Sequence, residues 1–264
     1  MSEQTVLYGV SGGVATITLN RPELHNAFNE IVIGELTRYF EKAGEDKYVR
    51  AVVLRGEGKS FSAGGDLNWM RRMADYTYQQ NVTDAMRLGT LLKTINTLPK
   101  PTIALVQGNA FGGGVGLTAC CDIAIAEEGA QFCLSEVRIG LIPSIIAPYV
   151  MAAIGPRQAR RYFMTAERFD ARTAERIGLV HEVCPKGALD QAREAVVLSL
   201  LDGAPQAQRR GKSVILGIAG RAIDDEMIKF TVEQIAEARA SDEGKEGLSA
   251  FLNKSEPSWR NKKA

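Results

Sequence analysis

The sequence predicts an α/β fold with a largely parallel sheet, and two observations lead to this prediction. Short runs of apolar and β-branched residues, typical of strands buried on both faces, recur at residues 51–54, 101–106 and 123–126. Stretches in which apolar residues have helical spacing lie between these runs. Strands that alternate with helices predict a parallel sheet with helices packed on its faces.

The remaining elements follow in chain order. Residues 14–19 alternate and are β-branched, which predicts a strand that ends at Asn20-Arg21-Pro22. Residues 55–65 are rich in glycine and serine and predict a loop. Helices are expected over residues 30–43, over about 75–95, and from the glycine cluster 112–114 through Ala119.

From Ile145 onward the pattern is mainly helical. Asp170 to Glu175 is typical of a capped helix start, and residues 226–254 are expected to be charged, helical and amphipathic. We therefore expect a core that holds the active site over residues 1–200 and a helical C-terminal region over residues 201–264.

Composition excludes several classes of protein. The chain has 264 residues and a formal net charge of +1, so nothing favours nucleic acid or an anionic membrane as a partner. No apolar run approaches the roughly 20 residues of a membrane helix, and no secretory signal is visible, so we expect a cytoplasmic protein. The four cysteines form no CxxC pair and there are only two histidines, so neither a metal site nor a Ser-His-Asp triad is expected.

Two glycine-rich turns are candidates for ligand binding. Residues 61–67 follow one buried strand and residues 108–114 follow the next. This edge of an α/β sheet is where ligands usually bind, and glycine lets a ligand approach the backbone closely. Two such turns side by side can direct two N–H donors at one oxygen; alternatively, the glycines only make tight turns. Neither turn fits a nucleotide-binding fingerprint.

Glu136 is the candidate acid–base residue. It lies in the mostly apolar stretch of residues 132–142. A carboxyl group in such surroundings has a raised pKa, which suits proton transfer near neutral pH. The alternative is a surface glutamate paired with Arg138.

Taken in order, these features resemble the crotonase superfamily, also called the enoyl-CoA hydratase/isomerase family. The resemblance covers almost the whole chain and is carried by Asn20-Arg21-Pro22 with Asn26-Ala27, residues 61–66, residues 108–114, residues 121–126, Ala130-Gln131-Phe132, Glu136 with residues 140–143, and residues 250–254. It implies a spiral of ββα turns and a helical C-terminal region that makes trimer contacts, often with trimers stacked into hexamers.

The resemblance also implies site residues. The backbone N–H groups of Gly65 and Gly113 would form an oxyanion hole for the enolate of a coenzyme A thioester, and donors of this kind are typically worth about 3 kcal/mol of barrier each. Substrate-wall positions would be Ala63, Asp66 and Leu67, and the C-terminal Phe251 and Lys254 would approach the CoA nucleotide. The alternative for this last pair is a core phenylalanine and a solvated lysine. CoA is then part of the substrate, and no metal, nicotinamide or flavin is expected.

The chain departs from the family pattern at two places. Gly116 stands where standard hydratases carry a first catalytic glutamate, and residues 144–147 replace a run of small residues with apolar bulk near the acyl pocket. Three explanations remain open: hydration of an activated substrate with Glu136 alone, isomerisation with a single glutamate, or another reaction such as C–C cleavage. For a glutaconyl-CoA substrate, Arg138 is a candidate to bind the second carboxylate.

The first explanation is preferred, because residues 133–141 with Gly116 resemble bacterial methylglutaconyl-CoA and isohexenylglutaconyl-CoA hydratases of leucine and acyclic-terpene breakdown. Glu136 would then act as general base on water and return the proton to the α-carbon. A hypothesis of another class is a CoA-ester-binding protein or an RNA-binding scaffold that has lost its chemistry.

Overall fold

The main sheet of the protein is largely parallel, as predicted. The computed structural model describes residues 4–260. Within them, a six-stranded sheet has the order β1-β2-β3-β4-β6-β9. Its strands are β1 (Val6–Ser11), β2 (Val14–Leu19), β3 (Ala51–Gly56), β4 (Thr102–Val106), β6 (Ile123–Glu127) and β9 (Glu182–Cys184). Only β1 and β2 pair antiparallel, and all other neighbours in this sheet are parallel.

A second sheet was not predicted. It consists of β5 (Asn109–Phe111), β7 (Gln131–Cys133) and β8 (Phe169–Asp170), in that order. Strands of two or three residues are too short to show an alternating pattern, and β5 lies inside the second glycine-rich turn. This small sheet fixes that turn in space, because β5 pairs parallel with β7, the strand that leads toward Glu136.

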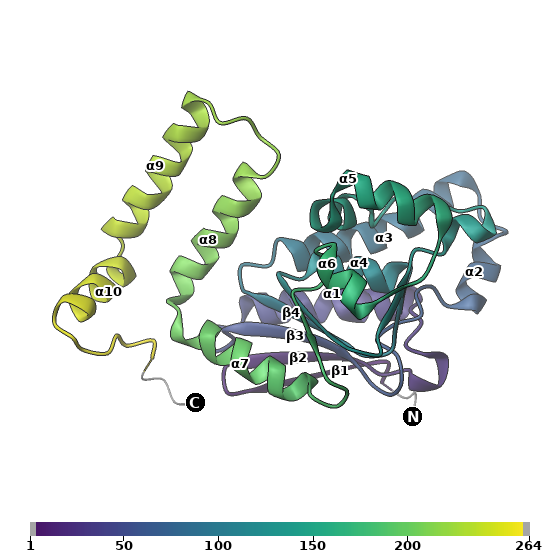
Figure 1. The fold of residues 1–264 in the computed structure, drawn as a ribbon, viewed down its shortest axis with the longest axis horizontal. Coiled ribbons are helices and arrows are strands. Elements are labelled where there is room, and N and C mark those ends of the chain that lie inside the picture. Colours follow the sequence, from purple (N-terminus) through teal and green to yellow (C-terminus); the bar gives the residue numbers. More distant parts are fainter. Residues whose placement is uncertain (1–3, 261–264) are drawn as a thin grey trace.

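Helices cover both faces of the main sheet (Figure 1). The helices of the core are α1 (Glu30–Glu45), α2 (Leu67–Met73), α3 (Tyr78–Asn96), α4 (Gly113–Cys120), α5 (Ala147–Thr165), α6 (Ala171–Arg176) and α7 (Leu189–Asp202). Two short 3-10 helices, η1 (Pro22–Leu24) and η2 (Glu136–Ile139), interrupt the loops. A capping box at Thr77 starts α3 slightly later than expected, and the Asp170 side chain caps α6 as the sequence indicated.

The hydrophobic core explains why the buried strands have continuous apolar sequences. One face of the sheet, with Val52, Leu54 and Ala104, packs in the main core with α1, α3 and α4. The opposite face, which includes Val53 and Ile103, packs under α7. Both faces are therefore buried, and the alternation seen in one-sided sheets is absent.

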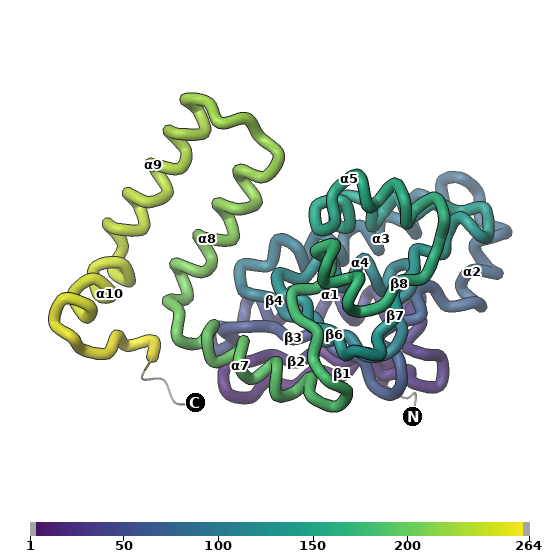
Figure 2. The backbone as a smooth tube through the Cα atoms, in the orientation of Figure 1, coloured from purple at the N-terminus to yellow at the C-terminus, as the bar shows by residue number. Residues whose placement is uncertain are grey.

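The last two of the three C-terminal helices stand away from this core, whereas the first is tied to it by an ion pair of 2.8 Å between Lys212 and Asp122 (Figures 1 and 2). The three helices are α8 (Pro205–Ile218), α9 (Asp225–Ala240) and α10 (Asp242–Leu252). Residues 226–254 are helical, as expected, but they form two helices: the chain becomes extended at Ser241, whose side chain caps α10. Many of their apolar side chains are exposed, namely Ile215, Leu216, Ile228, Val232, Ile235, Leu248, Phe251 and Leu252.

None of the described helices has both the length and the apolar character that spanning a membrane requires. The division of the chain at residue 200 stays a prediction.

Candidate active site

The two glycine-rich turns lie side by side, joined by backbone hydrogen bonds. The N–H of Ser62 donates to the carbonyl of Asn109 at 3.0 Å, and the N–H of Phe111 donates back to the carbonyl of Ser62 at 2.9 Å. At Gly64, where φ is +88°, an added β-carbon would lie 2.8 Å from the carbonyl oxygen of Phe111 and 3.7 Å from the nitrogen of Gly113. Only glycine permits this approach, because the left-handed backbone and the short contact both exclude a side chain.

Gly65 and Gly113 carry N–H groups that are free to bind a ligand. Within the described residues, neither N–H donates a hydrogen bond. Both glycines are partly exposed, whereas their neighbours Gly64, Gly112 and Gly114 are buried. Gly113 is the first residue of α4, so its N–H has no acceptor inside the helix and lies at the positive end of the helix dipole. The two turns therefore present two donors at one partly open edge, an arrangement suited to an oxygen that gains negative charge.

Glu136 lies directly against the second turn. A β-carbon placed on Gly112 would lie 3.2 Å from Glu136 Oε1. The other carboxylate oxygen, Oε2, is buried and has no hydrogen-bond partner. Burial raises the pKa of Glu136 above its ordinary value. The sequence predicted apolar surroundings of this kind.

The alternative of a surface Glu136–Arg138 pair is wrong. Arg138 Nη2 donates to the carbonyl of Ala166 at 2.7 Å instead. The loop that carries Glu136 is held by its own backbone, because the N–H of Leu141 donates to the carbonyl of Glu136 at 3.0 Å. Glu136 is thus positioned by the backbone, while Oε2 of its carboxyl group has no hydrogen-bond partner.

At the Gly116 position there is no room for a second acid. A β-carbon on Gly116 would lie 2.2 Å from Ile146 Cγ2, far inside van der Waals contact. Ile146 is only 3% exposed. The apolar bulk that the sequence indicated after Pro143 therefore occupies the space of the missing glutamate side chain.

Asp66 is committed to the local structure. Its Oδ1 accepts hydrogen bonds from the N–H groups of Asn68 and Trp69, which caps α2, and its Oδ2 forms an ion pair of 2.9 Å with Arg21. Burial raises the pKa of Asp66, but the hydrogen bonds from Trp69, Arg21 and Asn68 outweigh it and hold the pKa below its usual value. A substrate contact by this side chain stays a prediction.

Ala63 and Leu67, the other predicted wall positions, flank the first turn. The N–H of Ala63 donates to the carbonyl of His25 at 2.9 Å, so the backbone of this residue is fixed. Leu67 begins α2 and is 70% exposed. Both residues lie within two positions of Gly65 in the chain, and their contact with a ligand stays a prediction.

Phe251 and Lys254 are not brought to this site within one chain. They lie at the end of α10, and Figure 1 shows α10 and α2 at opposite ends of the molecule. Phe251 is 80% exposed, so the alternative of a core phenylalanine is wrong.

Several residues that support the site were missed in the sequence. Asn26 is buried, and its Nδ2 donates to the carbonyls of Glu57 and Ser60, both at 2.8 Å. The Phe28 ring lies under Gly113, where a β-carbon would be 2.2 Å from Cζ. Asn26 is one of the residues that carry the family resemblance. Its place next to apolar residues was the signal in the sequence that it is buried. Nothing local identifies Phe28, because its contact is far away in the sequence.

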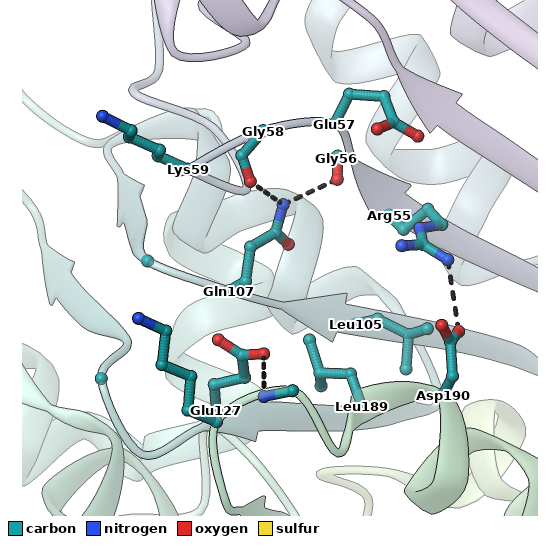
Figure 3. A pocket seen from close by; sticks show the side chains of 14 residues that line it. Arg55, Gly56, Glu57, Gly58, Lys59, Leu105, Gln107, Glu127, Leu189 and Asp190 are labelled. Atoms are coloured by element: carbon teal, nitrogen blue, oxygen red, sulfur yellow. Dashed lines mark hydrogen bonds and ion pairs between the residues drawn. The ribbon is translucent and has the colours of Figure 1, made fainter.

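A cavity of about 610 Å³ lies where β3, β4 and β6 end (Figure 3). Arg55 pairs with Asp190 at 3.2 Å in its wall, and Glu127 accepts from the N–H of Gly187 at 2.9 Å. Gln107 donates to the carbonyl of Gly56 at 2.6 Å and so ties the two loops together. None of the predicted site residues lines this cavity.

Comparisons with known proteins find relatives over almost the whole chain. A family model described as enoyl-CoA hydratase/isomerase matches residues 9–262. A candidate enoyl-CoA hydratase of Thermus thermophilus is 33% identical over 93% of this chain and 97% of its own. A short-chain enoyl-CoA hydratase of Clostridium acetobutylicum is 31% identical over 96% of this chain and 97% of its own.

A solved structure has the same fold. The crystal structure of an enoyl-CoA hydratase of Shewanella pealeana matches with a TM-score of 0.95 and 44% identity, over 97% of this chain and 96% of that one. The α/β fold is therefore of the crotonase type, and the chain belongs to the enoyl-CoA hydratase/isomerase family as an enzyme of the hydratase, carbon–oxygen lyase, type.

Proposed function

We propose that the protein adds water across the C2=C3 double bond of a 3-substituted glutaconyl-CoA thioester, with Glu136 as its acid–base residue. The observation that carries the proposal is the position of the Glu136 carboxylate. Its Oε2 is buried and unpartnered, and its Oε1 lies beside Gly112, one residue before the free N–H of Gly113. An unsatisfied buried carboxylate is costly, and such groups occur where a proton must be moved.

The proposed reaction uses the groups of the two turns in order. The ionised carboxylate of Glu136 takes a proton from water, and the water oxygen bonds to C3. The electrons of the double bond move to the thioester carbonyl, whose oxygen becomes an enolate held by the N–H groups of Gly65 and Gly113. The protonated Glu136 then delivers its proton to C2 and the carbonyl reforms, so that the net change is the addition of one water molecule.

One carboxylate is sufficient for this cycle because it acts first as base and then as acid. The raised pKa of Glu136 suits both roles, since a group that titrates nearer neutral pH gives up and accepts protons more evenly. Gly116 and Ile146 leave no space for a second acid beside it.

A glutaconyl-CoA substrate is a more specific proposal than hydration of an enoyl-CoA thioester in general. It rests on the resemblance of residues 133–141 to glutaconyl-CoA hydratases. Such a substrate carries a second carboxylate, and Arg138 is the candidate to bind it. Arg138 Nη2 donates to the carbonyl of Ala166, and the same guanidinium has further N–H donors that could bind the carboxylate.

A second candidate is isomerisation of an enoyl-CoA double bond. In that reaction Glu136 would remove a proton from C2 and return it to C4, with no water added. The apolar wall made by Ile146 favours it, because this wall offers no polar group to hold a water molecule. A non-catalytic CoA-ester-binding role is less favoured, since Gly65, Gly113 and Glu136 are all retained in a site of catalytic type.

We further propose that the C-terminal helices pack on neighbouring copies in a homotrimer or a hexamer. The exposed apolar side chains of α8, α9 and α10 support this proposal. Phe251 and Lys254 would then approach the CoA nucleotide bound by another subunit, because they cannot reach Gly65 of their own chain.

The test is an assay of the purified protein with 3-methylglutaconyl-CoA, isohexenylglutaconyl-CoA and crotonyl-CoA. Loss of the enoyl-thioester absorbance is followed, and products are identified by mass. A glutaconyl product heavier by one water molecule supports hydration. A product of unchanged mass with a shifted double bond supports isomerisation, and no turnover of any ester contradicts both.

A further inference from the structure

Trp69 connects the first glycine-rich turn to α3. Two carbons in the larger ring of its indole, Cε3 and Cζ3, lie 3.8 Å from the place of a β-carbon on Gly65, which is an ordinary van der Waals distance. Its Nε1 donates to Oδ1 of Asp84, a residue of α3, at 3.3 Å. These contacts are on opposite edges of the indole, because Nε1 is bonded to the ring carbon opposite Cζ3. The buried ring is therefore held between Gly65 and Asp84.

Asp84 is a buried acid that the proposed reaction does not use. It is 8% exposed, and within residues 4–260 its only partner is Trp69 Nε1, with no lysine or arginine paired to it. The other buried residues of α3 are apolar, namely Leu88, Leu91, Leu92 and Ile95. A buried carboxyl group without a cation is costly, so an apolar residue would suit this face of α3 better. The contact with Trp69 is what distinguishes Asp84 from its apolar neighbours.

The N–H of Gly65 needs support from neighbouring residues, because glycine has no side chain of its own to pack. Hydrogen bonds hold the backbone on either side of it: the N–H of Phe28 donates to the carbonyl of Gly64, and the N–H of Asp66 donates to the carbonyl of Phe28. In the described part of the chain the N–H of Gly65 itself donates no hydrogen bond, so none fixes its direction. Packing of the indole beside its α-carbon limits the rotation that glycine otherwise permits.

We propose that Asp84 is a positioning residue, which orients Trp69 so that the indole keeps the N–H of Gly65 directed at the thioester oxygen. The inference rests on the proposed function in one respect, namely that Gly65 is an oxyanion donor, and it is independent of the acyl group. Charge on the oxygen develops in the transition state, so a displaced donor weakens the enolate more than the ground-state carbonyl. The loss is therefore expected in kcat and much less in KM.

Variants of Asp84 and Trp69 test this role with whichever enoyl-CoA ester the wild type turns over. Asp84→Asn keeps an oxygen that accepts from Trp69 Nε1, so kcat should stay close to the wild-type value. Asp84→Ala removes the acceptor, and kcat should fall by about 10-fold. This is less than the loss of about 10²–10³-fold when an oxyanion donor is removed, because Gly65 is displaced and not lost. Trp69→Phe removes both the donor and the ring edge beside Gly65, and it should lower kcat at least as much.

The matched control is Thr102→Val. Thr102 is buried, and its Oγ1 donates to Asp122 Oδ2 at 2.9 Å, at the opposite end of β4 from the glycine-rich turn that follows this strand. The control also removes a buried hydrogen bond, so it should lower Tm, as Asp84→Ala does, but it should keep the wild-type kcat.

Tryptophan fluorescence reports the surroundings of the indole directly. Trp69 and Trp259 are the two tryptophans of the chain, so in a Trp259→Phe background the emission comes from Trp69 alone. Trp259 donates to the carbonyl of Asp202 in the C-terminal part of the chain, so its replacement should leave kcat unchanged. The buried Trp69 should emit at short wavelength in this background and with Asp84→Asn added, and at longer wavelength with Asp84→Ala.

The inference is overturned if Asp84→Ala or Trp69→Phe keeps the wild-type kcat, or if Asp84→Ala lowers kcat without changing the emission. It is also overturned if Thr102→Val lowers kcat equally, or if Asp84→Asn loses as much activity as Glu136→Gln, since Asp84 would then act as a catalytic acid. Failure of the proposed function has a different signature, because it is seen in the wild type alone, as no hydration of any glutaconyl ester.

Discussion

Replacing Gly113 by alanine should damage catalysis more than the same change at Gly65, although both N–H groups have the same proposed role. A β-carbon on Gly113 would lie 2.2 Å from Phe28 Cζ and 3.1 Å from Cε1, and this ring is only 2% exposed. Because the ring is packed on all sides, the start of α4 must shift by about 1 Å, and a misplacement of that size can cost about 10²-fold in rate.

At Gly65 the nearest atom to such a β-carbon is Met70 Cε, at 2.8 Å. This is the end of a flexible side chain that can move aside, so the N–H of Gly65 keeps its position. We therefore expect Gly113→Ala to lower kcat by about 10²–10³-fold, comparable to the loss of one oxyanion donor. Its unfolding free energy should fall by about 1–3 kcal/mol from overpacking. Gly65→Ala should show a much smaller loss of both.

The assay compares kcat, KM and urea unfolding of the two variants, using a glutaconyl-CoA ester that the wild type hydrates. Phe28→Leu in the Gly113→Ala background should recover part of the activity, because it removes the atom that causes the overlap. The reasoning is refuted if Gly113→Ala turns over as fast as the wild type, or if the two alanine variants are equally impaired.

Four further predictions concern Glu136, Asp66 and Gly108. The kcat/KM profile should fall on the acid side with an apparent pKa above about 4.3, the ordinary value for glutamate, because Glu136 must be ionised to accept a proton and burial raises its pKa. The same shift should make the wild type lose stability, relative to Glu136→Gln, as the pH rises through that raised pKa; parallel profiles in a thermal-unfolding series would contradict this. Asp66→Ala should lower the unfolding free energy by about 3 kcal/mol, since it removes a helix cap and leaves Arg21 unpaired in a mostly buried site, and a loss within error in a urea titration would show that the pair contributes nothing. Gly108→Ala should unfold at a clearly lower temperature, because φ is +58° and the new β-carbon would lie 1.9 Å from the carbonyl oxygen of Lys59; an unchanged Tm would contradict this.

The main sheet could be predicted because its signals are local. Strands β3, β4 and β6 are short apolar runs, and burial between α1 on one face and α7 on the other requires such runs. The strand β5 could not be predicted, since three residues inside a glycine-rich turn show no period. The break at Ser241 was missed because the apolar spacing continues across it, and only the capping contact to the N–H of Gly244 ends the pattern.

In the candidate site, too, the features with a local sequence signal were predicted, and those that depend on distant contacts were not. Glu136 and the two turns were predicted from short motifs in which each residue type has a chemical reason to be present. The contact between Ile146 and Gly116 was not predicted, because the two residues are distant in the sequence. They meet only where α5 begins beside α4. The sequence indicated bulky apolar side chains after Pro143, but only the folded structure shows that Ile146 packs against Gly116.

The central claim, that Glu136 alone drives hydration, is tested most directly with 3-methylglutaconyl-CoA in water enriched in heavy oxygen, using the wild type and Glu136→Gln side by side. The account predicts a heavy-oxygen hydroxyl product from the wild type. It predicts a rate about 10²–10⁴-fold lower from the variant, with binding of the ester largely retained. Equal rates of heavy-oxygen incorporation by the two proteins would contradict the claim and assign the proton transfer to another group.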